Sequence, residues 1–168
     1  MKMSAISPSN ATPAAAQAAG DDPGGAMYRF LACTADQYIT RAVTTVTRQI
    51  TMRELAALFD KHDFNSFPVV ESGTMLGIVT KFDFLRAFAF TTGQMVPHYS
   101  ELMRRPVGEM MTEAVVHVEP STPLPRVLQL MVSIKARSFP VLSPERQLLG
   151  MISREDVMRA LRETTRNS

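Results

Sequence analysis

The sequence predicts an α/β protein of two β-α-β-β-α repeats that pack sheet to sheet about a pseudo-twofold axis. Two observations support this prediction. NSFPVV (65–70) returns as RSFPVL (137–142) after 72 residues, and GIVTKFD (77–83) returns as GMISRED (150–156) after 73. Around them, apolar spacing alternates between strand-like and helical in the same order in both halves. A unit of this size exposes an apolar sheet face, which the second copy is expected to cover.

Each copy begins with a short β-branched run and continues into a helix. Ala42 to Val46 and Val115 to Val118 have the β-branched composition that favours strands. The apolar residues that follow recur at helical spacing: Met52, Leu55, Ala56 and Phe59 in the first copy, and Val127, Leu130, Met131 and Ile134 in the second. Pro123 and Pro125 stand where a first helical turn tolerates proline.

A hairpin and a second helix complete each copy. The predicted strand pairs are Phe67 to Val70 with Met75 to Val79, and Phe139 to Leu142 with Leu148 to Ile152. Turn residues separate the strands at 71–74 and at 143–147. The second helix is expected to begin at Lys81 and again at Arg154.

The starts of these second helices have the spacing of a capping box. Thr80 precedes Asp83 by three residues, and Ser153 precedes Asp156 likewise, so each hydroxyl is expected to accept a helix N–H. The same place can hold a polar ligand, because an aspartate can accept hydrogen bonds from both hydroxyls of a ribose. The structural role and the ligand-binding role are compatible.

The repeated pattern resembles the cystathionine-β-synthase (CBS) domain family, and the pair resembles a Bateman module. The matching segments are GEMMTEAVVHVEPSTPLPRVLQLM, RSFPVL and GMISREDVMRAL in the second copy, and ITRAVTTVTRQITMRELAALF, NSFPVV and GIVTKFDFLRAF in the looser first copy. We divide the chain into a flexible Ala-, Pro-, Ser- and Gly-rich tail (1–26), repeat 1 (27–90), a linker (91–107) and repeat 2 (108–168).

The resemblance implies a set of ligand contacts. In CBS pairs that bind adenosyl compounds, the motif aspartate holds the ribose and the Ser/Thr lies near the phosphate, which implicates Thr80, Asp83, Ser153 and Asp156. Basic residues for phosphate often precede the Phe-Pro-Val strand, where this chain has Arg137 and Ser138 in the second copy but Asn65 and Ser66 in the first. The implied base contacts are Val43, Thr45 and Ile78 in one cleft, and Val115, His117 and Met151 in the other.

The function that follows is regulatory and not enzymatic. The resemblance implies a stand-alone module that senses AMP, ATP or another adenosyl compound and regulates an unidentified protein in trans. A ligand-free dimerisation module is the alternative. An enzyme ranks third, because His62, His98 and His117 lack metal-ligand spacing and Cys33 has no recognisable base partner.

A homodimer is expected from the aromatic-rich stretch Phe82, Phe84, Leu85, Phe88 and Phe90. A short helix cannot bury all these side chains in its own core. Part of the stretch is expected to cover the partner repeat, and the remainder to form a dimer surface, as in similar modules that assemble into discs.

Charge and hydropathy limit the other partners. The formal net charge is +2 and no Lys/Arg run exceeds the pair Arg104 and Arg105, so neither nucleic acid nor an anionic membrane is expected as a partner. No apolar stretch of about 18 residues and no signal-peptide pattern occurs. With a single cysteine, these features predict a cytoplasmic protein.

Overall fold

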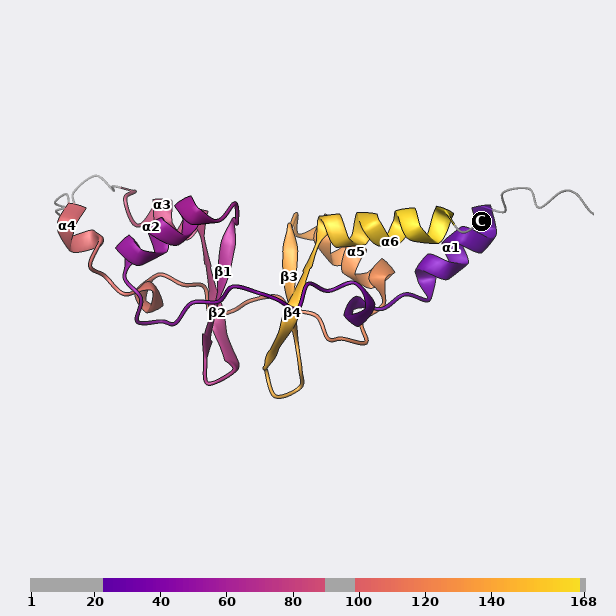
Figure 1. The fold of residues 1–168 in the computed structure, drawn as a ribbon, viewed down its shortest axis with the longest axis horizontal. Helices are drawn as coiled ribbons and strands as arrows, with labels where there is room; N and C mark the ends of the chain where they lie inside the picture. The colour runs from indigo at the N-terminus through magenta and orange to yellow at the C-terminus, as the bar shows by residue number, and fades with distance from the viewer. Residues whose placement is uncertain (1–22, 90–98, 167–168) are drawn as a thin grey trace, which may run out of the picture.

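Two small sheets stand side by side at the centre of the molecule, and the helices lie on their outer sides (Figure 1). The computed structural model describes residues 23–89 and 99–166. The elements are α1 (Pro23–Leu31), α2 (Met52–Lys61), β1 (Ser66–Glu71), β2 (Thr74–Thr80), α3 (Lys81–Arg86), α4 (Tyr99–Leu102), α5 (Leu124–Ser133), β3 (Ser138–Leu142), β4 (Leu148–Ser153) and α6 (Arg154–Arg166). The predicted fold class, two repeats of mixed α/β structure, is confirmed.

Each sheet is one antiparallel hairpin. Phe67 lies opposite Val79 in β1–β2, and Phe139 lies opposite Ile152 in β3–β4. These four side chains are buried, and both hairpins have a register shift at the same repeat position. The equivalence of the two hairpins agrees with the duplication seen in the sequence.

The β-branched runs that precede α2 and α5 are not regular strands, which corrects the prediction for 42–46 and 115–118. Each run forms a single parallel bridge to the hairpin that follows it, Val46 with Val69 and Val118 with Val141. The rest of each run has no regular structure and crosses between the two halves; we call residues 38–46 and 110–118 the crossing segments. Because each run crosses from one half to the other, only its last residue lies close enough to its own hairpin to pair with it.

Each half of the molecule contains chain from both repeats. Phe30 and Ala35, at the N-terminal end of repeat 1, are buried in the core that α5, β3, β4 and α6 form. Conversely, Met110 and Met111 of repeat 2 pack against the core around α2, β1 and β2, beside the buried linker residue Val107. We call these two halves the first lobe (α2, β1, β2, α3, α4) and the second lobe (α1, α5, β3, β4, α6). They lie on the left and on the right of Figure 1.

The glycine that opens each repeated motif lies where a crossing segment contacts a sheet. A Cβ atom at Gly150 would lie 2.7 Å from the Thr40 carbonyl oxygen, and one at Gly77 would lie 2.6 Å from the Thr112 carbonyl oxygen. Backbone hydrogen bonds fix these approaches: the N–H of Thr40 donates to Met151 at 2.8 Å and that of Ile78 to Thr112 at 2.9 Å. Only glycine leaves room for this contact.

Two expected boundaries differ from the structure. Helix α1 begins at Pro23, inside the segment predicted as a tail, and α4 lies inside the predicted linker. The tail prediction for residues 1–22 falls outside the described residues, as do Phe90 and His98. The sequence pattern did not reveal the apolar face of α1, which includes Phe30. Only about one turn of this helix lies beyond residue 26, where the predicted tail ends.

The aromatic stretch on α3 packs within its own lobe, contrary to the expectation that part of it covers the partner repeat. The Phe84 ring lies 6.5 Å from Phe59 and 5.5 Å from Phe88. The reason is the position of α3, on the side of its sheet that faces away from the second lobe (Figure 1). Phe82 and Leu85 are 71% and 64% exposed and remain candidates for a dimer surface.

Candidate functional site

A cleft of 510 Å³ lies between the lobes, near the start of α6. The crossing segment of repeat 1 forms part of the lining, and the end of β4 with the first turn of α6 forms another part beside it. The chain just before β1 and just before β3 closes the sides. The lining residues are Thr40, Ala42, Val43, Thr44, Asp63, Phe64, Asn65, Ser66, Pro68, Arg137, Ser138, Met151, Ser153, Arg154, Glu155 and Asp156.

Ser153 and Asp156 form a complete capping box in this lining. The N–H and the hydroxyl of Ser153 donate to Asp156 Oδ2 at 2.9 Å and 2.7 Å, and the Asp156 N–H donates to Ser153 Oγ at 3.3 Å. Thr80 and Asp83 form the same three bonds at 3.0, 2.7 and 3.0 Å. The predicted capping role is confirmed at both positions, and both aspartates are buried.

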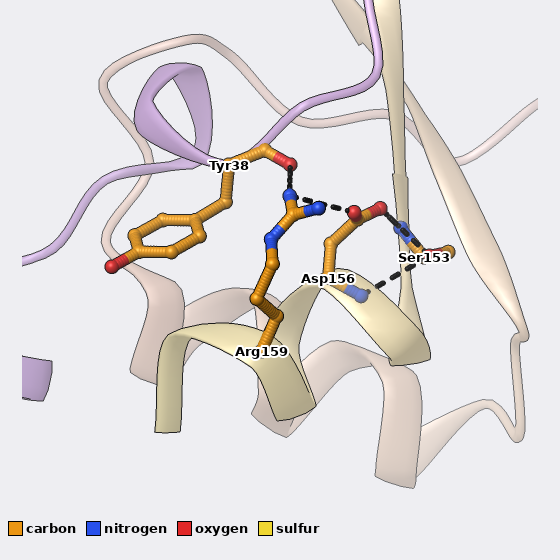
Figure 2. A network of polar contacts seen from close by, with 4 residues as sticks. All are labelled: Tyr38, Ser153, Asp156 and Arg159. Carbon is orange, nitrogen blue, oxygen red and sulfur yellow. Dashed lines mark hydrogen bonds and ion pairs between the residues drawn. The ribbon is translucent and has the colours of Figure 1, made fainter. Parts of the chain in front are cut away.

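The second oxygen of each aspartate is bound by an arginine three residues later. The Arg159 guanidinium lies 3.0 Å from Asp156 Oδ1 and donates at 2.9 Å to the Tyr38 carbonyl oxygen. Figure 2 shows how Arg159 lies between these two partners. In the first lobe, Arg86 lies 3.0 Å from Asp83 Oδ1 and donates to the Met110 carbonyl at 3.4 Å. Each carboxylate is therefore held in one orientation against a crossing segment.

Tyr38 supports this arrangement in the second lobe with its ring as well as its backbone. The Arg159 guanidinium lies over the ring, 5.9 Å from its centroid, a cation–π geometry. Burial, together with the neighbouring Cys33 and Glu163, raises the pKa of Tyr38 to about 12. The hydroxyl therefore keeps its proton to a higher pH than that of an exposed tyrosine, whose pKa is about 10.

The crossing changes which predicted residues lie together. Val43 was expected beside Ile78, but it lines the cleft with Met151 and Asp156. Ile78 instead pairs with Thr112, in the segment that leads to Val115. Val43 and Ile78 therefore do not lie together, because each crossing segment contacts the strand of the other repeat.

The remaining predicted residues divide into three groups. Arg137 and Ser138 line the cleft with Ser153, as expected. Thr45 and His117 are exposed, and neither belongs to the cleft lining. Thr80 and Asp83 lie at the start of α3, in the other lobe.

Sequence reasoning missed several residues of this site. It assigned Asn65 and Ser66 to a separate cleft, although they line the same one as Arg137 and Ser138. Arg159 and Arg86 were not singled out, although an arginine three residues after each motif aspartate is repeated in the sequence. Asp63 and Glu155 have no counterpart in the other repeat, so the repeat comparison gave no signal for them.

Residues 23–89 and 99–166 offer neither a metal site nor a membrane-spanning helix. That part of the chain contains no cluster of three or more His, Cys, Asp or Glu side chains able to bind a metal ion. Nor does it include a helix with the length and apolar character needed to cross a bilayer.

Known proteins of the same fold support the duplication. A model of the CBS domain matches residues 35–90 and 107–163. The protein MJ1225 of Methanocaldococcus jannaschii is 27% identical over 128 residues, 74% of this chain and 45% of that protein. The chain therefore spans about half the length of this curated relative.

Two solved structures share the fold. The CBS-pair protein CBSX2 of Arabidopsis thaliana, in complex with AMP, has a TM-score of 0.65 at 23% identity, over 77% of this chain and 96% of that one. The CBS pair of MJ0100, in complex with 5′-methylthioadenosine and S-adenosyl-L-methionine, has a TM-score of 0.62 at 22% identity, over 78% of this chain and 97% of that one. With a family match over both repeats, the chain belongs to the CBS domain family, as a tandem pair.

Proposed function

We propose that this chain is a regulatory module, not an enzyme, that binds an adenine nucleotide or a related adenosyl compound between its two repeats. The observation that supports this most is the 510 Å³ cleft, in which Val43 of one repeat lies with Met151 and the capped helix start of the other. Its volume is within the range of about 300 to 1,000 Å³ that small-molecule sites occupy. A flat adenine fits between apolar walls of this kind.

The polar residues around the cleft suit the rest of such a ligand. Oδ2 of Asp156 already accepts two hydrogen bonds from Ser153, but Oδ1 accepts only one, from Arg159. The second lone pair of Oδ1 can therefore accept a ribose hydroxyl while both protein contacts are kept. Arg137, with the Ser138 hydroxyl beside it, is the proposed phosphate contact. Thr80, Asp83, Ile78 and Val115 are proposed to form the equivalent contacts in the other half.

The solved relatives agree with this ligand class. AMP is bound to CBSX2, and 5′-methylthioadenosine and S-adenosyl-L-methionine are bound to the CBS pair of MJ0100. An adenosyl group is common to all three compounds. The proposal for this chain is limited to that shared chemistry.

A ligand in this cleft would bias the arrangement of the lobes. It would contact the crossing segment through Val43 and the second lobe through Asp156, so its binding energy would favour one relative position of the two. A partner protein, bound in trans, would respond to that position. We propose that this regulation takes place in the cytoplasm.

A homodimer is proposed through the exposed helix faces. An apolar groove of 260 Å³ lies between α5 and α6, lined by Met131, Val157 and Leu161 among others. At its rim Met158 is 55% exposed, and the equivalent residue of the first lobe, Leu85, is 64% exposed.

Light scattering should give a dimer mass at micromolar concentration. A monomer mass for Leu85→Glu/Met158→Glu, with the dimer retained in Arg162→Glu, would assign the interface; a monomeric wild type would contradict the proposal.

The second candidate is a dimerisation module that binds no ligand. It is favoured by Asp83 and Asp156, whose oxygens all have protein partners and so do not require a ligand. Calorimetric titration with AMP, ATP and S-adenosylmethionine separates the two candidates. Saturable binding supports the sensor, and no heat with any of the three compounds, together with a dimer mass, supports the ligand-free module.

A further inference from the structure

The cleft lining contains two acidic and two basic side chains in addition to the buried Asp156. Asp156 is paired with Arg159 at 3.0 Å. The other carboxylates are Asp63 and Glu155, both exposed, and the guanidinium groups are Arg137 and Arg154. The lining therefore carries no surplus of positive charge.

One of the two guanidinium groups is already bound by the backbone. Arg154 donates through Nε to the Ala136 carbonyl oxygen at 2.8 Å and through a terminal nitrogen to that of Lys135 at 3.1 Å. The Arg137 carbonyl oxygen accepts from the Arg154 backbone N–H at 3.0 Å, but no described residue forms a hydrogen bond or an ion pair with the Arg137 guanidinium. Within the described lining, Arg137 alone is thus a guanidinium ready to form two hydrogen bonds with a phosphate.

The fold does not require the two exposed acids. The repeat offset places Lys135 at the position equivalent to Asp63, and Phe82 at the position equivalent to Glu155. The helix that Phe82 belongs to is capped in the same way as the helix that Glu155 belongs to. The two acids are therefore a property of this cleft and not of the repeat.

We infer, on the basis of the proposed function, that Asp63 and Glu155 make this cleft selective for adenosyl compounds with little negative charge. A nucleoside or a monophosphate uses Asp156 and, where a phosphate is present, Arg137. The further phosphates of ADP and ATP find no second unbound cation and meet two carboxylates. These like charges repel within the 510 Å³ cleft, because the Debye length is about 10 Å at 0.1 M salt.

The test is a set of calorimetric titrations of the full chain with adenosine, AMP, ADP and ATP, in buffer without Mg²⁺ and with a chelator. AMP is expected to bind at least about tenfold more tightly than ATP, a difference of about 1.4 kcal/mol. The difference is expected to shrink between about 0.05 and about 0.3 M salt, because salt screens the repulsion.

Charge-removal variants then identify the residues. Asp63→Asn/Glu155→Gln should raise the ATP affinity by at least about tenfold and the AMP affinity by less, since ATP carries more charge. The matched control, Glu101→Gln/Glu109→Gln, removes two exposed carboxylates that do not line the cleft, one on α4 and one at the end of the 3-10 helix Val107–Glu109. It should leave the AMP-to-ATP ratio as in the wild type.

The outcomes separate this inference from the proposed function. If ATP binds as tightly as AMP, or if both double variants change the ratio equally, the charge selectivity is wrong while the proposed function stands. If no adenosine compound binds, the proposed function fails and this inference with it.

Discussion

The Arg159 guanidinium joins Asp156 of the cleft to Tyr38 of the crossing segment, at 3.0 Å from Oδ1 of the first and 2.9 Å from the carbonyl oxygen of the second. A helix of repeat 2 and a segment of repeat 1 thus meet through one side chain (Figure 2). Arg159 does not line the cleft. Its effect on a ligand would be exerted by holding the Asp156 carboxylate in place.

Arg159→Met tests this positioning role. The variant should weaken adenosine binding about tenfold, about 1.4 kcal/mol, while the melting temperature hardly changes, because a half-exposed ion pair contributes about 0 to 1 kcal/mol. The wild-type preference for adenosine over 2′,3′-dideoxyadenosine should fall as well. Arg162→Met, on the same helix, is the control. If the preference survives in Arg159→Met, Arg159 has no part in orienting the carboxylate.

Asp156→Asn and Asp156→Glu separate the cap from a ribose contact. Asn can still accept near the helix start but lacks one acceptor and the charge, so nucleotide affinity should fall about tenfold or more. Glu can serve in a capping box but moves its carboxylate by one methylene. Titration calorimetry that finds unchanged affinity in both variants would leave Asp156 a purely structural residue.

Gly150→Ala tests the close approach of the crossing segment. The added Cβ would meet the Thr40 carbonyl oxygen at 2.7 Å, so the free energy of unfolding should fall by about 1 to 3 kcal/mol. Gly73→Asn is the control, since Gly73 has a positive φ but no atom within 4 Å of a Cβ. Equal denaturant midpoints for Gly150→Ala and the wild type would show that the backbone at Thr40 can move away from residue 150 without loss of stability.

Phe30→Ala tests whether α1 is part of the second lobe. The Phe30 side chain is 3% exposed in that core, and truncating a buried phenylalanine costs about 3 to 5 kcal/mol. Tyr28→Ala, on the same helix at 74% exposure, should change stability by about 0.5 kcal/mol or less. Thermal unfolding measures both, and a similar small shift for the two variants would mean that α1 adds little to the core.

Tyr38 should make stability depend on alkaline pH. Its pKa is about 12 in the folded chain and about 10 when unfolded, so its contribution is complete below about pH 10 and is lost as the pH rises towards 12. Denaturant midpoints measured across this range should fall more steeply in the wild type than in Tyr38→Phe. Parallel curves for the two proteins would contradict the raised pKa.

The sequence predicted the features that local residues determine. The helix starts at Lys81 and Arg154 and both hairpins were placed correctly, because caps, turns and alternating apolar residues act within a few positions of the chain. The crossing was not predicted, because the contact of Thr40 with Met151 joins distant parts of the chain. The glycines at 77 and 150 were the one local sign that backbone approaches the sheet there.

The crossed cores have a consequence for how the molecule unfolds. Arg29 donates to the Thr164 carbonyl at 3.2 Å across 135 residues of sequence, and Met110 and Met111 of repeat 2 likewise pack against the core of the first lobe. Neither lobe can lose its structure without exposing apolar side chains supplied by the other repeat. Heat should therefore melt both lobes in one cooperative transition, with equal calorimetric and van't Hoff enthalpies, despite the chain's internal duplication.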